Sequence, residues 1–220
     1  MFTNGGYCER MYVPDRKYLA PLDGLDPITA APLACGGLTA YRAVDHGIKA
    51  LAPMQRQGRV LLIGVGGLGQ YAIRYLRLLT NAKIIALDVA EDKRSRALEL
   101  GADEAIGPDE DIAPCDLIID FIGSDITLAT AAGAVARKGM IIVVGLGGGQ
   151  TNFGLGKVPP EARFMTSFWG TRQQMDELLE LARREPSIMP SVETLPLSDA
   201  QHAHNRLREG RVAGRVVLIP

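Results

Sequence analysis

A glycine-rich turn between an apolar strand and a helix constrains the fold of this 220-residue chain most strongly. Residues 60–63 read Val-Leu-Leu-Ile, and Gly64, Gly66 and Gly69 follow in the spacing G-x-G-x-x-G. In this pattern the first glycine permits the tight turn, the second lets backbone approach a pyrophosphate, and the third lets the helix pack close to the strand. We expect the helix to start near Gly66 and to offer unpaired N–H groups to phosphates. The motif therefore predicts a dinucleotide-binding turn.

An acidic residue stands where the ribose of such a cofactor would lie. Residues 84–87 form a second apolar strand, and Asp88 follows it, nineteen positions beyond Gly69. A carboxylate there can accept hydrogen bonds from both ribose hydroxyls and repels a 2′-phosphate, so NAD is favoured over NADP. Two alternatives stay open: the turn binds nothing, or Asp88 is a solvated cap of the helix that begins near Glu91.

The composition is that of an ordinary globular protein. Hydrophobic residues make up 47% of the chain and charged residues 22%, the net charge is −1, and no apolar run is long enough to span a membrane. The N-terminus lacks the basic and apolar regions of a signal peptide, so the cytoplasm is the expected location. Scattered Lys and Arg argue against a nucleic-acid partner. Cys8, Cys35 and Cys115 are too few and too far apart for a disulfide framework or a four-cysteine zinc site.

Strand and helix signals alternate from residue 60 onward, which predicts an α/β fold with a doubly wound parallel sheet. We expect further strands over 104–106, 117–122 and 140–144, with helices over 91–100 and 126–135. The last two strands run into glycine-bearing turns, and the carboxyl ends of parallel strands line a cofactor crevice. Residues 163–169 read as a sixth, edge strand. Its apolar side chains favour pairing with a second subunit, so we expect a homo-oligomer joined through residues 163–168.

The two ends of the chain differ from this central sheet. Residues 7–18 read as a strand followed by a turn, and residues 30–44 as a helical region broken by Pro32 and Gly36. The final part reads as a strand over 192–195, a helix over 198–208 and a strand over 215–219. We therefore expect a dinucleotide-binding domain over residues 45–170, flanked by segments 1–44 and 171–220 that look like pieces of another domain.

These flanks resemble the zinc-containing medium-chain alcohol dehydrogenases. The resemblance lies in Gly-Gly-Tyr-Cys-Glu-Arg at 5–10, Ala-Pro-Leu-Ala-Cys-Gly-Gly-Leu-Thr at 31–39 and Leu-Arg-Glu-Gly-Arg-Val-Ala-Gly-Arg at 207–215. It runs over essentially the whole chain in the family's order, but it covers only the later two-thirds of a typical member. It implies a Rossmann domain with remnants of a GroES-like catalytic domain at both ends: a strand and hinge helices in residues 1–44, and helices and a strand in residues 171–220.

The resemblance also implies a zinc ligand at Cys35. In the family a cysteine and a histidine from the part that is missing here hold the catalytic zinc together with a ligand at this position. Zinc catalysis needs three protein ligands and one open site, so this sequence supplies one of three. Cys35 and Thr39 are then the candidate catalytic residues. Without the resemblance, Cys35 reads as a small buried residue that packs at a helix start.

Further cofactor contacts follow from the resemblance. Thr39 matches a threonine at the nicotinamide face, Arg215 an arginine that pairs with a phosphate, and Lys93 a lysine that reaches the adenosine ribose. For Lys93, a solvated helix cation is the alternative. The implied cofactor-binding set is Thr39, Gly64, Gly66, Gly67, Leu68, Gly69, Asp88, Lys93, Ile122, Gly123, Val144, Gly145, Leu146, Ser167, Trp169 and Arg215.

Three functional hypotheses follow. The first is an NAD-dependent oxidoreductase that transfers hydride between a zinc-bound small alcohol and the nicotinamide, or reduces an aldehyde or ketone in reverse. On this hypothesis the present chain binds NAD without efficient turnover. The second is an NAD-binding or interaction module without catalysis. The third is a zinc-free quinone or enone reductase, which Cys35 disfavours because such an enzyme has no use for a thiolate there.

Overall fold

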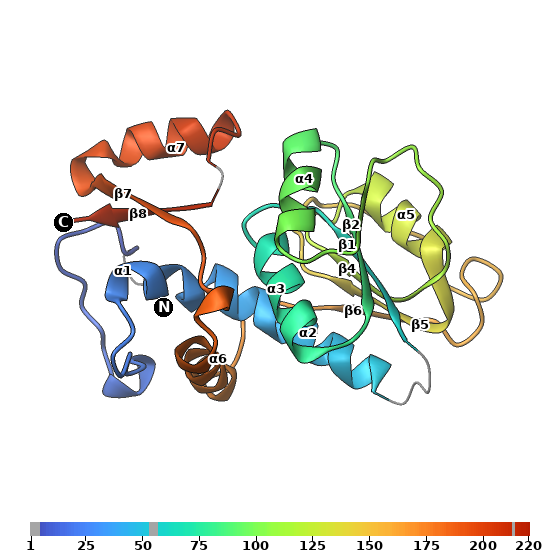
Figure 1. Cartoon of the computed structure of the whole chain (residues 1–220), viewed down its shortest axis with the longest axis horizontal. Coiled ribbons are helices and arrows are strands. Elements are labelled where there is room, and N and C mark those ends of the chain that lie inside the picture. Colours follow the sequence, from blue (N-terminus) through green and yellow to red (C-terminus); the bar gives the residue numbers. More distant parts are fainter. Residues whose placement is uncertain (1–4, 53–56, 213) are drawn as a thin grey trace. The chain divides into compact units, whose positions relative to one another are not determined.

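The computed structural model describes residues 5–52, 57–212 and 214–220. The chain divides into two units, one of Met1–Cys35 with Thr171–Pro220 and one of Gly36–Gly170. In chain order, with η for a 3-10 helix, the elements are η1 (Arg16–Tyr18), α1 (Pro27–Ala30), η2 (Ala31–Ala34), α2 (Gly36–Leu51), β1 (Arg59–Ile63), α3 (Gly69–Leu79), β2 (Lys83–Leu87), α4 (Glu91–Glu99), β3 (Glu104–Ile106), β4 (Cys115–Asp120), α5 (Asp125–Ala134), β5 (Val135–Val143), β6 (Arg163–Thr166), α6 (Arg172–Arg184), η3 (Pro186–Ile188), β7 (Val192–Pro196), η4 (Leu197–Asp199), α7 (Ala200–Arg208) and β8 (Arg215–Ile219) (Figure 1).

A six-stranded parallel sheet forms the centre of the unit Gly36–Gly170. Its strand order is β3-β2-β1-β4-β5-β6, and every neighbouring pair is parallel. The chain leaves β1 toward β3 and later resumes at β4 on the other side of β1, so the topological switch point lies between β1 and β4. The apolar runs of β1, β2 and β4 are almost entirely buried, as strands covered on both faces require. The predicted doubly wound parallel sheet is confirmed.

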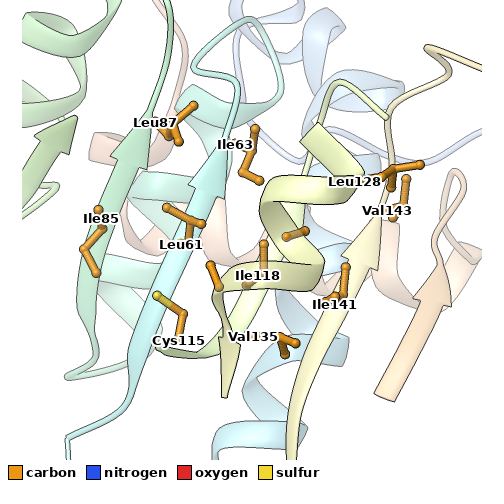
Figure 2. Close-up of a cluster of buried hydrophobic side chains, with 12 residues drawn as sticks. Leu61, Ile63, Ile85, Leu87, Cys115, Ile118, Leu128, Val135, Ile141 and Val143 are labelled. Carbon is orange, nitrogen blue, oxygen red and sulfur yellow. The ribbon is translucent and has the colours of Figure 1, made fainter. Parts of the chain in front are cut away.

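Helices cover both faces of this sheet. On one face Tyr41 of α2 packs edge-on against Tyr75 of α3, with ring centroids 5.8 Å apart, and α2 approaches β4 so closely that a Cβ on Gly47 would lie 2.4 Å from Leu117. On the other face α5 contributes Leu128 to a buried cluster with strand residues that include Ile118 (Figure 2). Each such buried Leu or Ile contributes about 1.5–3 kcal/mol.

The second unit joins the two ends of the chain. The α6 helix begins with a capping box, in which the Thr171 hydroxyl accepts from Gln174 N at 3.1 Å and Gln174 Oε1 accepts from Thr171 N at 3.1 Å. Arg172 of α6 donates to the backbone oxygens of Lys17 at 3.0 Å and Leu19 at 2.7 Å, which holds the early segment against the late helix. Strands β7 and β8 form a parallel pair. None of the helices in the described ranges is long and apolar enough to cross a membrane.

Most elements lie within one or two residues of their expected ranges. Apart from the start of α3, which is described with the glycine turn below, four differ by more. The expected strand within 7–18 is wrong, because residues 5–15 form no strand and Tyr12 is 79% exposed. Only η1 forms in that range, and its Arg16–Tyr18 turn follows Asp15, whose side chain accepts from Lys17 N. The α2 helix runs from Gly36 to Leu51, well beyond the expected end at 44.

The two remaining differences concern β5 and β6. The β5 strand begins at Val135, five residues before the expected start. Residues 137–138 are exposed and interrupt the apolar pattern, so the pattern indicated only the later part of the strand. The β6 strand ends at Thr166, three residues before the expected end at 169. The chain leaves the sheet there, and the backbone reaches a left-handed φ of +50° at Trp169. The β6 strand does lie at the sheet edge, as expected.

Candidate functional site

The glycine turn connects the carboxyl end of β1 to α3. Gly64 has φ +91°, a left-handed conformation that glycine adopts without strain, and its N–H donates to Leu87 O at 2.8 Å. A Cβ on Gly69 would lie 2.0 Å from the backbone oxygen of Gly64, so only glycine allows α3 to start this close to the turn. The helix begins at Gly69, three residues later than expected, because residues 65–68 complete the turn before helical backbone starts.

Open space lies at Gly66, in the turn that precedes this helix. A Cβ built on Gly66 would meet no atom of the described residues within 4 Å. Gly66 differs in this from Gly69, where a Cβ would collide with backbone. Among the described residues no side chain caps the N-terminus of α3, although Gln70 N already donates to the backbone oxygen of Gly66 at 3.1 Å. The end of an eleven-residue helix also carries partial positive charge. The turn therefore fits an anionic group such as a pyrophosphate.

Asp88 lies directly beside this turn, at the carboxyl end of β2. It is only 6% exposed, its Oδ2 accepts from Val65 N at 2.8 Å, and its Oδ1 accepts from Ala90 N at 3.0 Å. Asp88 is therefore not solvated, as one alternative had it, although its Oδ1 does accept from the N–H of Ala90, the N-cap residue of α4. A carboxylate offers about four acceptor positions, so Asp88 retains capacity for ribose hydroxyls.

The backbone around Asp88 is held by a residue that the sequence reasoning missed. Arg94 of α4 donates from Nη1 to the backbone oxygens of Asp88 and Val89, both at 3.0 Å. The sequence feature that could have indicated this role is the position of Arg94, six residues after Asp88, the acid that follows β2. Lys93 is half-buried in the first turn of α4.

The turns after β4 and β5 pack directly against each other through backbone atoms. Val144 N and Gly145 N donate to Asp120 O at 2.8 and 3.1 Å, and Gly147 N donates to Ile122 O at 2.9 Å. A Cβ on Gly145 would lie 2.1 Å from the Ile122 carbonyl carbon, and one on Gly123 would lie 2.4 Å from Gly145 O. Glycine is therefore required on both sides of this contact, and the exposed side chains of Ile122 and Leu146 flank it.

The segment after β6 continues the same sheet edge. Ser167 N donates to Val143 O at 2.8 Å, and the Ser167 hydroxyl is buried with no hydrogen-bond partner in the described part of the chain. Trp169 is 58% exposed and stacks on Phe168, with centroids 4.9 Å apart. Thr39 is 6% exposed in the first turn of α2, next to Leu38, whose side chain would lie 2.6 Å from a Cβ on Gly170. The structure thus brings Thr39 and Ser167 to the end of the sheet where Asp88 and Gly64 also lie.

Two candidate residues belong to the other unit. Cys35 is exposed between η2 and α2, and Arg215 is the half-buried first residue of β8. Within residues 5–52, 57–212 and 214–220, no group of three or more His, Cys, Asp or Glu side chains could hold a metal ion. Cys115, at the amino end of β4, is fully buried, and this burial raises the pKa of its thiol to about 11. Cys35 is thus a single candidate ligand, and the described residues do not fit a catalytic zinc.

Comparison with known proteins shows which proteins this chain is similar to. A family model described as zinc-binding dehydrogenase matches residues 67–184. An NAD-dependent alcohol dehydrogenase of Sulfolobus acidocaldarius is 36% identical over 228 residues, which cover 98% of this chain and 64% of that protein. A D-arabinose 1-dehydrogenase (NADP(+)) of Saccharolobus solfataricus is 30% identical, and the match covers 99% of this chain and 65% of that protein.

Solved structures show the likeness in three dimensions. The alcohol dehydrogenase of the hyperthermophilic archaeon Aeropyrum pernix superposes with a TM-score of 0.77 at 34% identity, over 87% of this chain and 58% of that one. The chain therefore spans slightly less than two thirds of the length of the relatives that it matches, at 64–65% for the two curated sequences.

Proposed function

The chain belongs to the zinc-binding dehydrogenase family, and from this premise we propose that it binds NAD along the carboxyl edge of its parallel sheet. Family membership confirms the resemblance to the zinc-containing medium-chain alcohol dehydrogenases. One observation carries the proposal: a helix N-terminus that no side chain of the described residues caps, with open space at Gly66, lies next to a buried acid, Asp88. The first feature suits a pyrophosphate, and the second suits an unphosphorylated ribose.

In this proposal each part of the crevice has one task. The N–H groups at the start of α3 hold the pyrophosphate, and Asp88 holds the adenosine ribose, with Lys93 near it. The backbone of Ile122–Gly123 and Val144–Leu146 lies along the nicotinamide half. Ser167, whose hydroxyl lacks a partner in the described residues, and Trp169 face the carboxamide, with Thr39 at the ring. Arg215 is proposed as the partner of a cofactor phosphate.

NAD supplies hydride transfer, and we propose an alcohol, or in reverse an aldehyde or ketone, as the substrate of the dehydrogenase to which this chain corresponds. Cys35 is proposed as one zinc ligand. Because the described residues hold no set of three ligands, we derive no step through zinc. The expected behaviour of the 220-residue chain is NAD binding without efficient turnover. A module that binds NAD and performs no catalysis is the second candidate, and the single candidate ligand favours it.

The test is to titrate the purified chain with NADH and NADPH, following the emission of Trp169, the one tryptophan of the sequence. NADH should bind more tightly than NADPH. Zinc, NAD and a panel of alcohols are then added. Turnover at ordinary dehydrogenase rates, about 1–1,000 per second, would contradict the expected lack of catalysis, and absence of any cofactor binding would remove the proposal itself.

We also propose a homo-oligomer joined through residues 163–168 and a location in the cytoplasm. The β6 strand lies at the edge of the sheet with Phe164 37% exposed, which supports strand pairing with a second copy. Cys8, Cys35 and Cys115 are all free thiols, which suits a reducing compartment. The molar mass of the purified chain, measured by light scattering, tests the oligomer.

A further inference from the structure

Asp120 is a buried acid that the proposed cofactor contacts leave unused. It is the last residue of β4 and is 0% exposed. Its Oδ1 accepts from Ile122 N at 2.8 Å and from Gly123 N at 3.0 Å. Its Oδ2 is buried and has no hydrogen-bond partner in the described residues. A buried carboxyl oxygen without a partner is costly, and such a group in a native fold calls for an explanation.

No cation offsets this carboxylate within the part of the chain that the structure describes, where the ion pairs all involve other acids. The carboxylate is also fixed in place, because two backbone N–H groups hold Oδ1. The backbone of the same residue is held as well, since Asp120 O accepts from both Val144 N and Gly145 N. Asp120 therefore presents a stationary carboxylate, without an ion-pair partner among the described residues, under the turn that follows β4.

The strand order places this charge under one half of the cofactor. Asp120 pairs in register with Ile63 of β1 on one side and with Val143 of β5 on the other. The switch point lies between β1 and β4, and a dinucleotide crosses the sheet there. Asp88 on β2 marks the adenosine half. Asp120, on the far side of the switch point, therefore lies on the nicotinamide half.

We propose that Asp120 is a specificity-determining residue that favours the oxidised cofactor, because its negative charge attracts the positively charged nicotinamide ring of NAD⁺ and not the neutral ring of NADH. The inference rests on the proposed function and deepens it. It assigns to this one side chain a contribution to the ratio of the two affinities, in addition to its role in holding the Ile122–Gly123 turn.

Strand spacing gives the size of the effect. Strands in a sheet lie about 4.8 Å apart, and the proposed carboxamide contacts Ser167 and Trp169 follow β6, which is two strands from β4, so we take the charges to be about 10–15 Å apart. At that distance and an effective dielectric constant of about 20, the Coulomb interaction of two unit charges corresponds to a change in affinity of about five- to fifteenfold. Removing the charge should therefore weaken NAD⁺ binding about five- to fifteenfold relative to NADH binding.

The test compares Asp120→Asn with the matched control Asp116→Asn. Asp116 is also buried, at 3% exposure, but it lies at the amino end of the same strand, where its Oδ2 accepts from Arg59 N at 2.9 Å. Dissociation constants for NAD⁺ and NADH are measured by calorimetry for the wild-type chain and both variants. Asp120→Asn should shift the ratio of the two constants as calculated, and Asp116→Asn should leave it unchanged.

Equal weakening of both cofactors by Asp120→Asn, or an unchanged ratio, would show that Asp120 only shapes the turn and would overturn the inference. If Asp120→Asn does not fold, the wild-type chain decides. It should bind NAD⁺ several-fold more tightly than a dinucleotide in which a neutral benzamide replaces the nicotinamide, and equal affinity would overturn the inference. A wild-type chain that binds neither NAD⁺ nor NADH removes the proposed function, which is a different result from an unchanged ratio.

Discussion

The contrast between Gly69 and Gly66 gives the sharpest prediction about the glycine turn. A Cβ at Gly69 would lie 2.0 Å from the backbone oxygen of Gly64 and 3.0 Å from its carbonyl carbon. An ordinary C···O contact is about 3.3 Å, so Gly69→Ala must move α3 or the turn by roughly 1.3 Å. The obstacle is backbone and cannot rotate away. We expect a loss of about 3 kcal/mol in the free energy of unfolding, the upper part of the range for overpacking.

Gly66→Ala serves as the matched control and as a second test. Its Cβ would meet nothing within 4 Å, so stability should change by less than about 0.5 kcal/mol. The same methyl group would occupy the open space assigned to the pyrophosphate, so NADH affinity should fall by about tenfold or more, a loss of about 1.4 kcal/mol.

Urea unfolding followed by Trp169 emission measures the first quantity, because Trp169 lies in the unit Gly36–Gly170 that contains both glycines. Calorimetric titration with NADH measures the second. A Gly69→Ala variant as stable as the wild type would refute the close approach of α3 to the turn. A Gly66→Ala variant with undiminished NADH affinity would refute the placement of the phosphates.

Two further predictions concern buried groups. Asp88→Ala should lower the free energy of unfolding by about 1–3 kcal/mol, because the N–H of Val65 loses its acceptor. The same variant should weaken NAD binding more than NADP binding. The control Asp92→Ala, on the exposed first turn of α4, should change neither quantity. The Cys115 thiol, with its pKa raised to about 11 by burial, should resist a thiol reagent at pH 8 until the chain unfolds, whereas exposed Cys35 should react at once. An unfolded cysteine titrates near pH 8.5, so from about pH 8.5 to 11 the unfolded chain binds fewer protons than the folded chain. The free energy of unfolding should therefore fall as the pH rises over that interval. Cys115→Ala should remove this part of the fall.

The central sheet could be predicted from sequence because its strands are buried on both faces. Such strands form continuous apolar runs, as in Val60–Ile63, and glycine or acidic residues end them abruptly. The pattern fails at β5, where Arg137 and Lys138 point to solvent inside a strand. These two exposed charged residues break the apolar run, so the sequence could show only the buried second half of the strand.

The first residues of the chain show a different limit. Residues 7–18 have the aromatic and β-branched content of a strand, but a strand also needs a neighbour to pair with. In the described residues this segment has none, and Tyr7 and Tyr12 are exposed. Pairing partners lie far away in sequence, so composition alone cannot reveal their absence.

The candidate site was accessible to sequence reasoning where its chemistry is tied to local spacing. Gly64, Gly66, Gly69 and Asp88 follow a fixed pattern along the chain, whereas Asp120 does not. Asp120 falls inside the expected strand over 117–122, and a single acid in an apolar run gives no sign that its side chain will hold the next turn. Its importance becomes visible only when burial and hydrogen bonds are known.

Hydrogen exchange measured by mass spectrometry with and without saturating NADH tests the position of the cofactor site directly. Protection should appear in peptides that contain the turn 64–69, the β2 end at Asp88 and the paired turns 122–123 and 144–149. Peptides at the amino end of the sheet, around Asp116, should be unchanged. Protection confined to the amino end, or none at all in a folded sample, would contradict a dinucleotide crevice at the carboxyl edge of this sheet.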